Sequence, residues 1–228
     1  MIDNATPYNA SDYDGEIFKT LPFYHVFHTE TIDLVRMLVP ALSVWLDTGC
    51  GTGYLAEQAL PHLPNTRFLL ADPAKSMLNR ARTRLAHFPS ERIDFLGSFA
   101  SEELAGIVSE TPQVITAIMC HHYGGTEVRR RATDTCFRLL EKGGLYVTFE
   151  NIRPTTERGV EIGLDRWCRF QIAAGRSEKA VQEHRFRFGR NYFPITVVDH
   201  LELLSATGFS LVEIFWRSHM QAGFYAIK

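Results

Sequence analysis

The sequence predicts an α/β protein with a doubly wound, mostly parallel, seven-stranded sheet, and three observations indicate it. Short apolar runs alternate with helical stretches between residues 44 and 149, which is the order expected of parallel βαβ units. A glycine-rich turn at 49–53 follows the first of these runs. The last two runs, at 211–216 and 223–227, are too close for a helical crossover, so we expect them to pair antiparallel.

The parallel strands and their connecting helices follow from this alternation. The expected strands are 44–47, 67–71, 93–96, 114–120 and 145–149. The expected helices between them are 54–63, 76–87, 102–108 and 128–140, and a last helix at 196–206 ends at Gly208. Ser76 is the expected N-cap of its helix, and Gly143-Gly144 is the expected end of the helix at 128–140.

Two segments lie outside the alternation. Residues 1–15 are polar and turn-rich, and 16–39 should form one or two helices interrupted at Pro22. A second stretch holds helix-like segments at 161–174 and 177–188, with no strand between them. We therefore expect one domain, 1–228, whose parts are an N-terminal lid at 1–40, a core at 41–152 and 196–228, and a helical insertion over the active site at 153–195.

Composition excludes several classes of protein. Hydrophobic residues make up 45% of the 228, which excludes intrinsic disorder. Twenty-four Lys and Arg against 26 Asp and Glu give a net charge of −2, which argues against a dedicated nucleic-acid-binding protein. The four cysteines form no Cys-x-x-Cys pair, which argues against a zinc site. Neither a signal peptide nor an apolar run of about 20 residues is visible, so we expect a cytoplasmic protein with no membrane partner.

The glycine-rich turn carries the chemistry. Residues 46–53 read Leu-Asp-Thr-Gly-Cys-Gly-Thr-Gly, where the first strand meets its helix. Asp72 lies 19 residues after Gly53, at the end of the second strand, where an acid can accept both hydroxyls of a ribose. A dinucleotide fingerprint would need a third glycine where Tyr54 or Ala56 stands. The pattern favours nucleoside binding over dinucleotide binding or an ordinary tight turn.

Glycines at every second residue after Asp47, followed by Asp72, resemble the corresponding motifs of class I S-adenosylmethionine-dependent methyltransferases. The likeness covers residues 44–228 and includes Gly143-Gly144 before the fifth strand and the closing strand pair. It implies a Rossmann-like methyltransferase fold, with S-adenosyl-L-methionine as the cofactor and S-adenosyl-L-homocysteine as its product.

The same resemblance implies roles for individual residues. The acid matching Asp72 holds the ribose, and the loop 49–51 lies against the methionine part. Residues matching Ser98 and Phe99 flank the adenine, and the backbone near Ala117 meets the amino group. The cofactor-binding residues expected on this basis are Tyr24, Asp47, Gly49, Cys50, Gly51, Asp72, Pro73, Met77, Ser98, Phe99 and Ala117.

The flanking segments are similar to one branch of this superfamily, the carboxy-S-adenosylmethionine synthases of tRNA wobble-uridine modification. Residues 21–24, Leu-Pro-Phe-Tyr, resemble the N-terminal helix break whose tyrosine touches the cofactor, which implies that role for Tyr24. The segment 183–200 resembles the one holding an arginine for the extra carboxylate, which implies that role for Arg185. The glycine motif, however, has the ordinary methyltransferase form.

Two side chains are the catalytic candidates. His121 follows the fourth strand in a Cys-His-His-Tyr turn, where an imidazole suits proton removal or substrate orientation. Alternatively, its ring packs under the cofactor and caps the strand. Arg185, with Arg187 beside it, should bind a carboxylate or phosphate, unless this basic run is a solvated helix face. Glu150 should bind a substrate donor or pair with an arginine of the insertion. His28 on the N-terminal helix either packs or belongs to the lid.

Three functions are consistent with these features. The first is methyl transfer to a small-molecule acceptor, which is anionic if Arg185 contacts it. The second is a carboxy-S-adenosylmethionine synthase-like enzyme, or a user of the carboxylated cofactor in tRNA modification. The third is an RNA-associated protein, which the balanced charge disfavours. We expect a small-molecule substrate and no nucleic acid as partner, and the sequence leaves a homodimer open.

Overall fold

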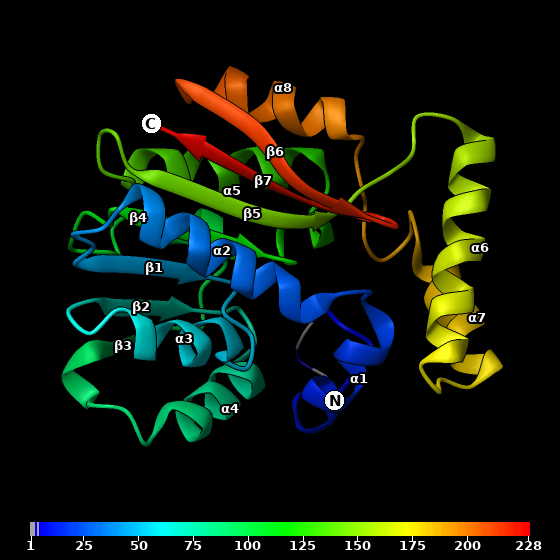
Figure 1. Cartoon of the computed structure of the whole chain (residues 1–228), viewed down its shortest axis with the longest axis horizontal. Helices are drawn as coiled ribbons and strands as arrows, with labels where there is room; N and C mark the ends of the chain where they lie inside the picture. Colours follow the sequence, from blue (N-terminus) through cyan, green and yellow to red (C-terminus); the bar gives the residue numbers. More distant parts are fainter. Residues whose placement is uncertain (1–2, 4) are drawn as a thin grey trace.

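The computed structural model describes residue 3 and residues 5–228, and a seven-stranded sheet forms its centre (Figure 1). The strand order is β3-β2-β1-β4-β5-β7-β6. Strands β1 to β5 are parallel, whereas β7 is antiparallel to both β5 and β6. The strands are β1 Val44–Thr48, β2 Arg67–Ala71, β3 Ile93–Gly97, β4 Val114–Ile118, β5 Leu145–Asn151, β6 Leu211–Ser218 and β7 Gln221–Ile227. The predicted doubly wound sheet with an antiparallel closing pair is confirmed.

Helices cover both faces of this sheet. The α-helices are α1 Ala10–Thr20, α2 Tyr24–Leu38, α3 Tyr54–Ala59, α4 Lys75–Leu85, α5 Thr126–Leu139, α6 Glu157–Ala173, α7 Glu178–Arg187 and α8 Val197–Thr207. The short 3₁₀ turns are η1 Leu60–His62, η2 Ser90–Arg92, η3 Ser101–Glu103 and η4 His121–Tyr123. Helices α2 and α3 lie on one face, and α5 and α8 lie on the other (Figure 1). Within the described residues, no helix combines the length and apolar character that crossing a membrane requires.

Alternation along the strands builds a separate core on each face. Trp45 of β1 belongs to the core that includes α2 and α3, and its neighbour Leu46 belongs to the core that includes α5 and α8. Trp45 is fully buried, stacks on Phe68 with ring centroids 5.1 Å apart, and donates its Nε1 proton to Thr116 Oγ1 over 2.9 Å. The strands read as continuous apolar runs because both faces of the sheet are covered.

The helix expected at 102–108 is present only as the 3₁₀ turn η3, and the bounds of several other helices differ from the sequence prediction. Helix α1 begins at Ala10, inside the polar, turn-rich segment 1–15, where no helix is expected from the sequence. Helix α4 begins at Lys75, and Ser76 is not its N-cap: the Ser76 N–H donates to the Asp3 carboxylate over 2.9 Å. Helix α5 ends at Leu139, and the Gly143 N–H instead donates to the Lys228 carbonyl over 2.9 Å. The last two differences arise because Asp3 and Lys228, which are distant in the sequence, accept the backbone N–H groups of Ser76 and Gly143.

The segment expected to be an insertion holds α6 and α7, which stand beside α1 at the carboxyl ends of the parallel strands (Figure 1). The chain leaves the core after Ile152 and returns at Ile195, and these two residues form an isolated parallel bridge. The indole of Trp167 in α6 is buried and donates to the Thr20 carbonyl of α1 over 2.6 Å. The insertion and the N-terminal helix therefore form one continuous wall around the strand ends.

Candidate active site

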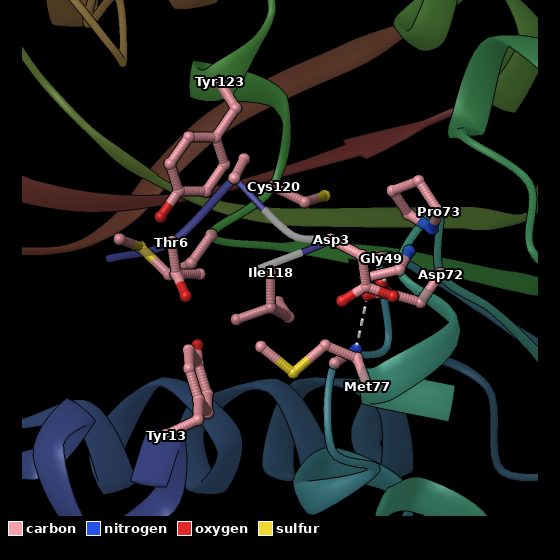
Figure 2. Close-up of a pocket in the computed structure, with 14 residues that line it drawn as sticks. Asp3, Thr6, Tyr13, Gly49, Asp72, Pro73, Met77, Ile118, Cys120 and Tyr123 are labelled. Atoms are coloured by element: carbon pink, nitrogen blue, oxygen red, sulfur yellow. Dashed lines mark hydrogen bonds between the residues drawn. The ribbon is translucent and has the colours of Figure 1, made fainter. Parts of the chain in front are cut away.

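Two adjacent cavities lie where β1, β2 and β4 end. The first, here the glycine-loop cavity, has a volume of about 340 Å³ and is lined by Tyr13, Gly51, Asp72, Met77 and Ile118 among others (Figure 2). The second, here the His121 cavity, has a volume of about 380 Å³ and is lined by residues 100–102, His121 and Val128 among others. Both have Gly49, Pro73, Cys120 and Tyr123 in their walls. Volumes of this size suit a small organic ligand, and the position is the switch point of an open α/β sheet.

The glycine turn forms one wall of the glycine-loop cavity. Gly49 and Gly51 have φ of 69° and 55°, in the left-handed region that favours glycine. A Cβ built on Gly49 would lie 2.6 Å from the Cβ of Cys120, so packing against the loop after β4 also excludes a side chain there. A Cβ built on Gly51 would meet no atom within 4 Å, so it would project into open space. The loop thus presents bare backbone, the cradle that the predicted cofactor needs.

Asp72 fixes this loop and keeps lone pairs for a ligand. Its Oδ2 accepts the Gly51 N–H and its Oδ1 accepts the Ala74 N–H, both over 2.8 Å. Burial raises the pKa of Asp72 to about 6, because the charged carboxylate loses its water, so the group is mostly ionised at neutral pH. An ionised carboxylate accepts up to about four hydrogen bonds. Asp72 can therefore also accept the two hydroxyls of a ribose, in agreement with the sequence prediction.

Asp47 lies behind the same loop. Its Oδ1 accepts a proton from Thr116 Oγ1 over 2.6 Å, and it is 2% exposed. Burial raises the pKa of Asp47 to about 7. It lines a small chamber of about 30 Å³, here the His28 chamber, together with Tyr24, His28 and Cys50. Two carboxyl groups, Asp47 and Asp72, therefore lie next to the glycine loop, which suits a ligand that carries positive charge.

The structure brings most of the predicted cofactor residues together and leaves three apart. Gly49, Gly51, Asp72, Pro73 and Met77 line the glycine-loop cavity, and Tyr24, Asp47 and Cys50 line the His28 chamber. Ser98 is exposed, and the Phe99 ring packs against Gly97. Ala117 is fully buried inside β4, and its carbonyl accepts the Thr148 hydroxyl over 2.7 Å. After strand β3, residues 100–102 line the His121 cavity, whereas Ser98 and Phe99 do not.

The environment of His121 does not suit a general base, because both ring nitrogens have partners and the side chain is buried. It lines the His121 cavity, with Nε2 2.8 Å from Ser101 Oγ and Nδ1 3.4 Å from the Tyr146 hydroxyl. Burial lowers the pKa of His121 to about 4, so the ring is a weak proton acceptor at neutral pH. This environment favours the alternative role, in which the ring packs beneath a ligand and caps the strand.

Glu150 contacts neither a substrate-sized cavity nor an arginine of the insertion, contrary to the sequence expectation. It accepts the backbone N–H groups of His121 and His122 over 3.0 and 2.9 Å, and its Oε2 lies 2.6 Å from His122 Nδ1. Burial alone would raise the pKa of Glu150, but the charge and hydrogen bonds of His122 outweigh it and lower the pKa to about 2. Glu150 therefore anchors the turn after β4 that shapes both cavities.

Arg185 does not have the inward position that the sequence predicts. Its Nη1 lies 2.6 Å from Asp165 Oδ1 of α6, and its side chain is 31% exposed. Because the segment is helical, residues two apart point about 200° away from each other. Arg187 instead lines a second small chamber of about 30 Å³, here the Arg187 chamber, with Tyr8, Tyr13, Asn151 and Tyr192 among its other walls.

The Arg187 chamber adjoins the glycine-loop cavity, with which it shares Thr6, Tyr13, Met119 and Tyr123. No motif in the sequence indicates Thr6, Tyr13 or Tyr123 as lining residues, although Tyr123 directly follows the histidine pair after β4. Burial raises the pKa values of Tyr13 and Tyr123, so both hydroxyls stay protonated. No Asp or Glu occurs among the described residues that line the Arg187 chamber.

Comparison with known proteins agrees with this geometry. Residues 46–146 match the model of the methyltransferase domain. The carboxy-S-adenosyl-L-methionine synthase of Nautilia profundicola is 21% identical over 224 residues, which is 96% of this chain and 92% of that protein. The CurJ carbon methyltransferase structure aligns with a TM-score of 0.67 at 18% identity, over 94% of this chain and 57% of its own. Human N-acetylserotonin methyltransferase in complex with S-adenosylmethionine aligns with a TM-score of 0.57 at 15% identity, over 99% of this chain and 60% of its own.

Proposed function

We propose that this chain is a class I S-adenosylmethionine-dependent methyltransferase that acts on a small-molecule acceptor with an anionic group. The match of residues 46–146 to the methyltransferase domain and the fold support the enzyme class. The observation that supports the acceptor class is the Arg187 chamber. It is too small for the acceptor itself, but it adjoins the glycine-loop cavity, where the acceptor would lie, and it presents a guanidinium and, among its described walls, no carboxylate. No described carboxylate lies within ion-pair distance of Arg187. An arginine suits this task because it can bind a carboxylate or phosphate with two hydrogen bonds.

The cofactor fits the residues at the strand ends. When bound, S-adenosylmethionine supplies a methyl group on a sulfonium, and the protein's task is alignment and exclusion of water. Asp72 would accept the ribose hydroxyls, and the bare backbone at Gly49 and Gly51 would lie along the methionine part. The base would enter the His121 cavity beside Pro73, with residues 100–102 at the position expected of Ser98 and Phe99.

The acceptor side is closed by the N-terminal segment. The Arg187 guanidinium donates to the Ala5 carbonyl over 2.5 Å, and Asp3 accepts the Ser76 N–H on the other side of the cavity. The side chains of Tyr13 and Tyr123 point into the glycine-loop cavity from opposite sides (Figure 2). This closure supports a small acceptor rather than a folded macromolecule, and the protonated tyrosines would donate hydrogen bonds to it.

A second function is favoured by the similarity to carboxy-S-adenosyl-L-methionine synthases, which spans 96% of the chain. In that case the anion near Arg187 would be the extra carboxylate of the cofactor, and not a group of the acceptor. The two functions place the same arginine beside different anions.

Mass spectrometry of the small molecules that co-purify with the protein tests both. S-adenosylmethionine or S-adenosylhomocysteine supports methyl transfer, whereas a carboxylated form supports the second function. With a panel of small carboxylates and phosphates as acceptors, Arg187→Met should lower turnover at least about tenfold, and Arg185→Met should not. Equal effects of the two variants would contradict the role of Arg187.

A further inference from the structure

His28 is a buried imidazole with no visible partner. It lies on α2, is 2% exposed, and neither ring nitrogen has a hydrogen-bond partner within the described chain. The rings of Tyr24 and Tyr54 each have their centroid 4.8 Å from the imidazole and 6.1 Å from one another, so the three rings form one cluster. Buried polar atoms are almost always hydrogen-bonded, because an unpaired one loses its water without compensation. The two unpaired nitrogens therefore indicate a ligand or a water.

The volume of the His28 chamber limits the size of that ligand. Its volume of about 30 Å³ is enough for one water-sized group. It adjoins the glycine-loop cavity, since Tyr13, Gly49, Gly51 and Ile118 are in the walls of both. A group that enters from the cavity past the glycine loop must therefore be about one heavy atom wide.

The charged groups around the chamber indicate the charge of the ligand. Asp47 lies in the wall of the chamber, and it interacts electrostatically with Asp72. Burial lowers the pKa of His28 to about 3, so the ring is neutral and offers one nitrogen as an acceptor. A carboxylate would be too large and would be repelled by Asp47. An ammonium group is one heavy atom, is positively charged, and needs acceptors for its three protons.

We infer that His28 is a binding residue for the α-ammonium group of the cofactor, which the imidazole and Asp47 hold in the His28 chamber. The inference rests on one part of the proposed function, which is that the cofactor is S-adenosylmethionine and so carries an α-ammonium group. It assigns to α2, and not to β4 near Ala117, the side chain that recognises the amino group.

Calorimetry with S-adenosylhomocysteine and its desamino analogue tests this on the purified full chain. The wild type should bind S-adenosylhomocysteine ~10- to 100-fold more tightly than the analogue, the range expected for hydrogen bonds to a charged group. His28→Phe keeps an aromatic ring against the two tyrosines but removes both nitrogens, and it should reduce the preference for S-adenosylhomocysteine over the analogue about tenfold. His25→Phe, on the exposed face of the same helix, should keep the full preference.

A measurement on the wild type does not depend on how the variant folds. In ¹⁵N-imidazole spectra, one buried histidine should change on addition of S-adenosylhomocysteine and not on addition of the desamino analogue. If the wild type binds the cofactor but His28→Phe keeps the full preference, or no such histidine signal changes, the inference is wrong and His28 contacts only water. If the wild type binds neither compound, the proposed function itself fails.

Discussion

Asp72→Ala should weaken cofactor binding, because it removes a charged ligand acceptor and also the group that holds the glycine loop in place. The side chain accepts the N–H groups of Gly51 and Ala74 at 2.8 Å each, and the substitution leaves both donors without their acceptor. It also removes the charged acceptor that the ribose hydroxyls need. A hydrogen bond to a charged group contributes about 1.5–3 kcal/mol, which corresponds to ~10- to 150-fold in Kd.

Titration calorimetry with S-adenosylhomocysteine measures this loss, and thermal unfolding shows whether the variant is folded. Asp33→Ala is the matched control, because Asp33 is exposed on α2 and lines none of the described cavities. Asp72→Asn should fall between the wild type and Asp72→Ala, since the amide keeps one of two acceptor oxygens. Unchanged affinity in a folded Asp72→Ala variant would refute the assignment of the ribose to this carboxylate.

Three further predictions follow from the same geometry. Gly51→Val should abolish cofactor binding in a protein that circular dichroism shows to be folded, whereas Gly106→Val, at an exposed glycine that also has a positive φ, should bind normally. Cofactor affinity should fall ~tenfold between pH 7 and pH 5, because protons compete for an Asp72 carboxyl with a pKa of about 6, and calorimetry should find a smaller fall in Asp72→Asn. Glu150→Gln should lower the free energy of unfolding by about 3 kcal/mol, because it breaks the buried pair with His122. Denaturant titrations should also show that the wild type loses this stability as the pH falls from 4.5 toward 2, and that the variant does not.

The cofactor side of the site could be predicted because its determinants are local. A βα turn needs glycines within a few residues of the strand end, and the position of Asp72 follows from the next strand alone. The structure places both beside one cavity. The same reasoning predicted the doubly wound, mostly parallel sheet with its antiparallel closing pair, since alternating strands and helices restrict the topology.

The acceptor side could not be predicted in this way, because its residues depend on how distant segments pack. Sequence spacing cannot tell Arg185 from Arg187 until the packing of α7 against α6 is known, and that packing directs Arg185 to Asp165. Nor does the sequence show that His28 lies behind the glycine loop, or that Asp3 binds the first turn of α4. Each of these contacts joins parts of the chain that lie at least 19 residues apart.

The bridge between Ile152 and Ile195 has a consequence for how such an enzyme diverges. Because the chain leaves and re-enters the sheet at one point, the 42 residues between them can change in length without a change in strand order, provided that the contacts of Trp167 and Tyr192 with the core are kept. Selectivity for the acceptor can then evolve as a replaceable module, while the nucleoside-binding half stays under separate selection. A chimera that joins a relative's loop at these two isoleucines would be the natural unit for changing what the enzyme methylates.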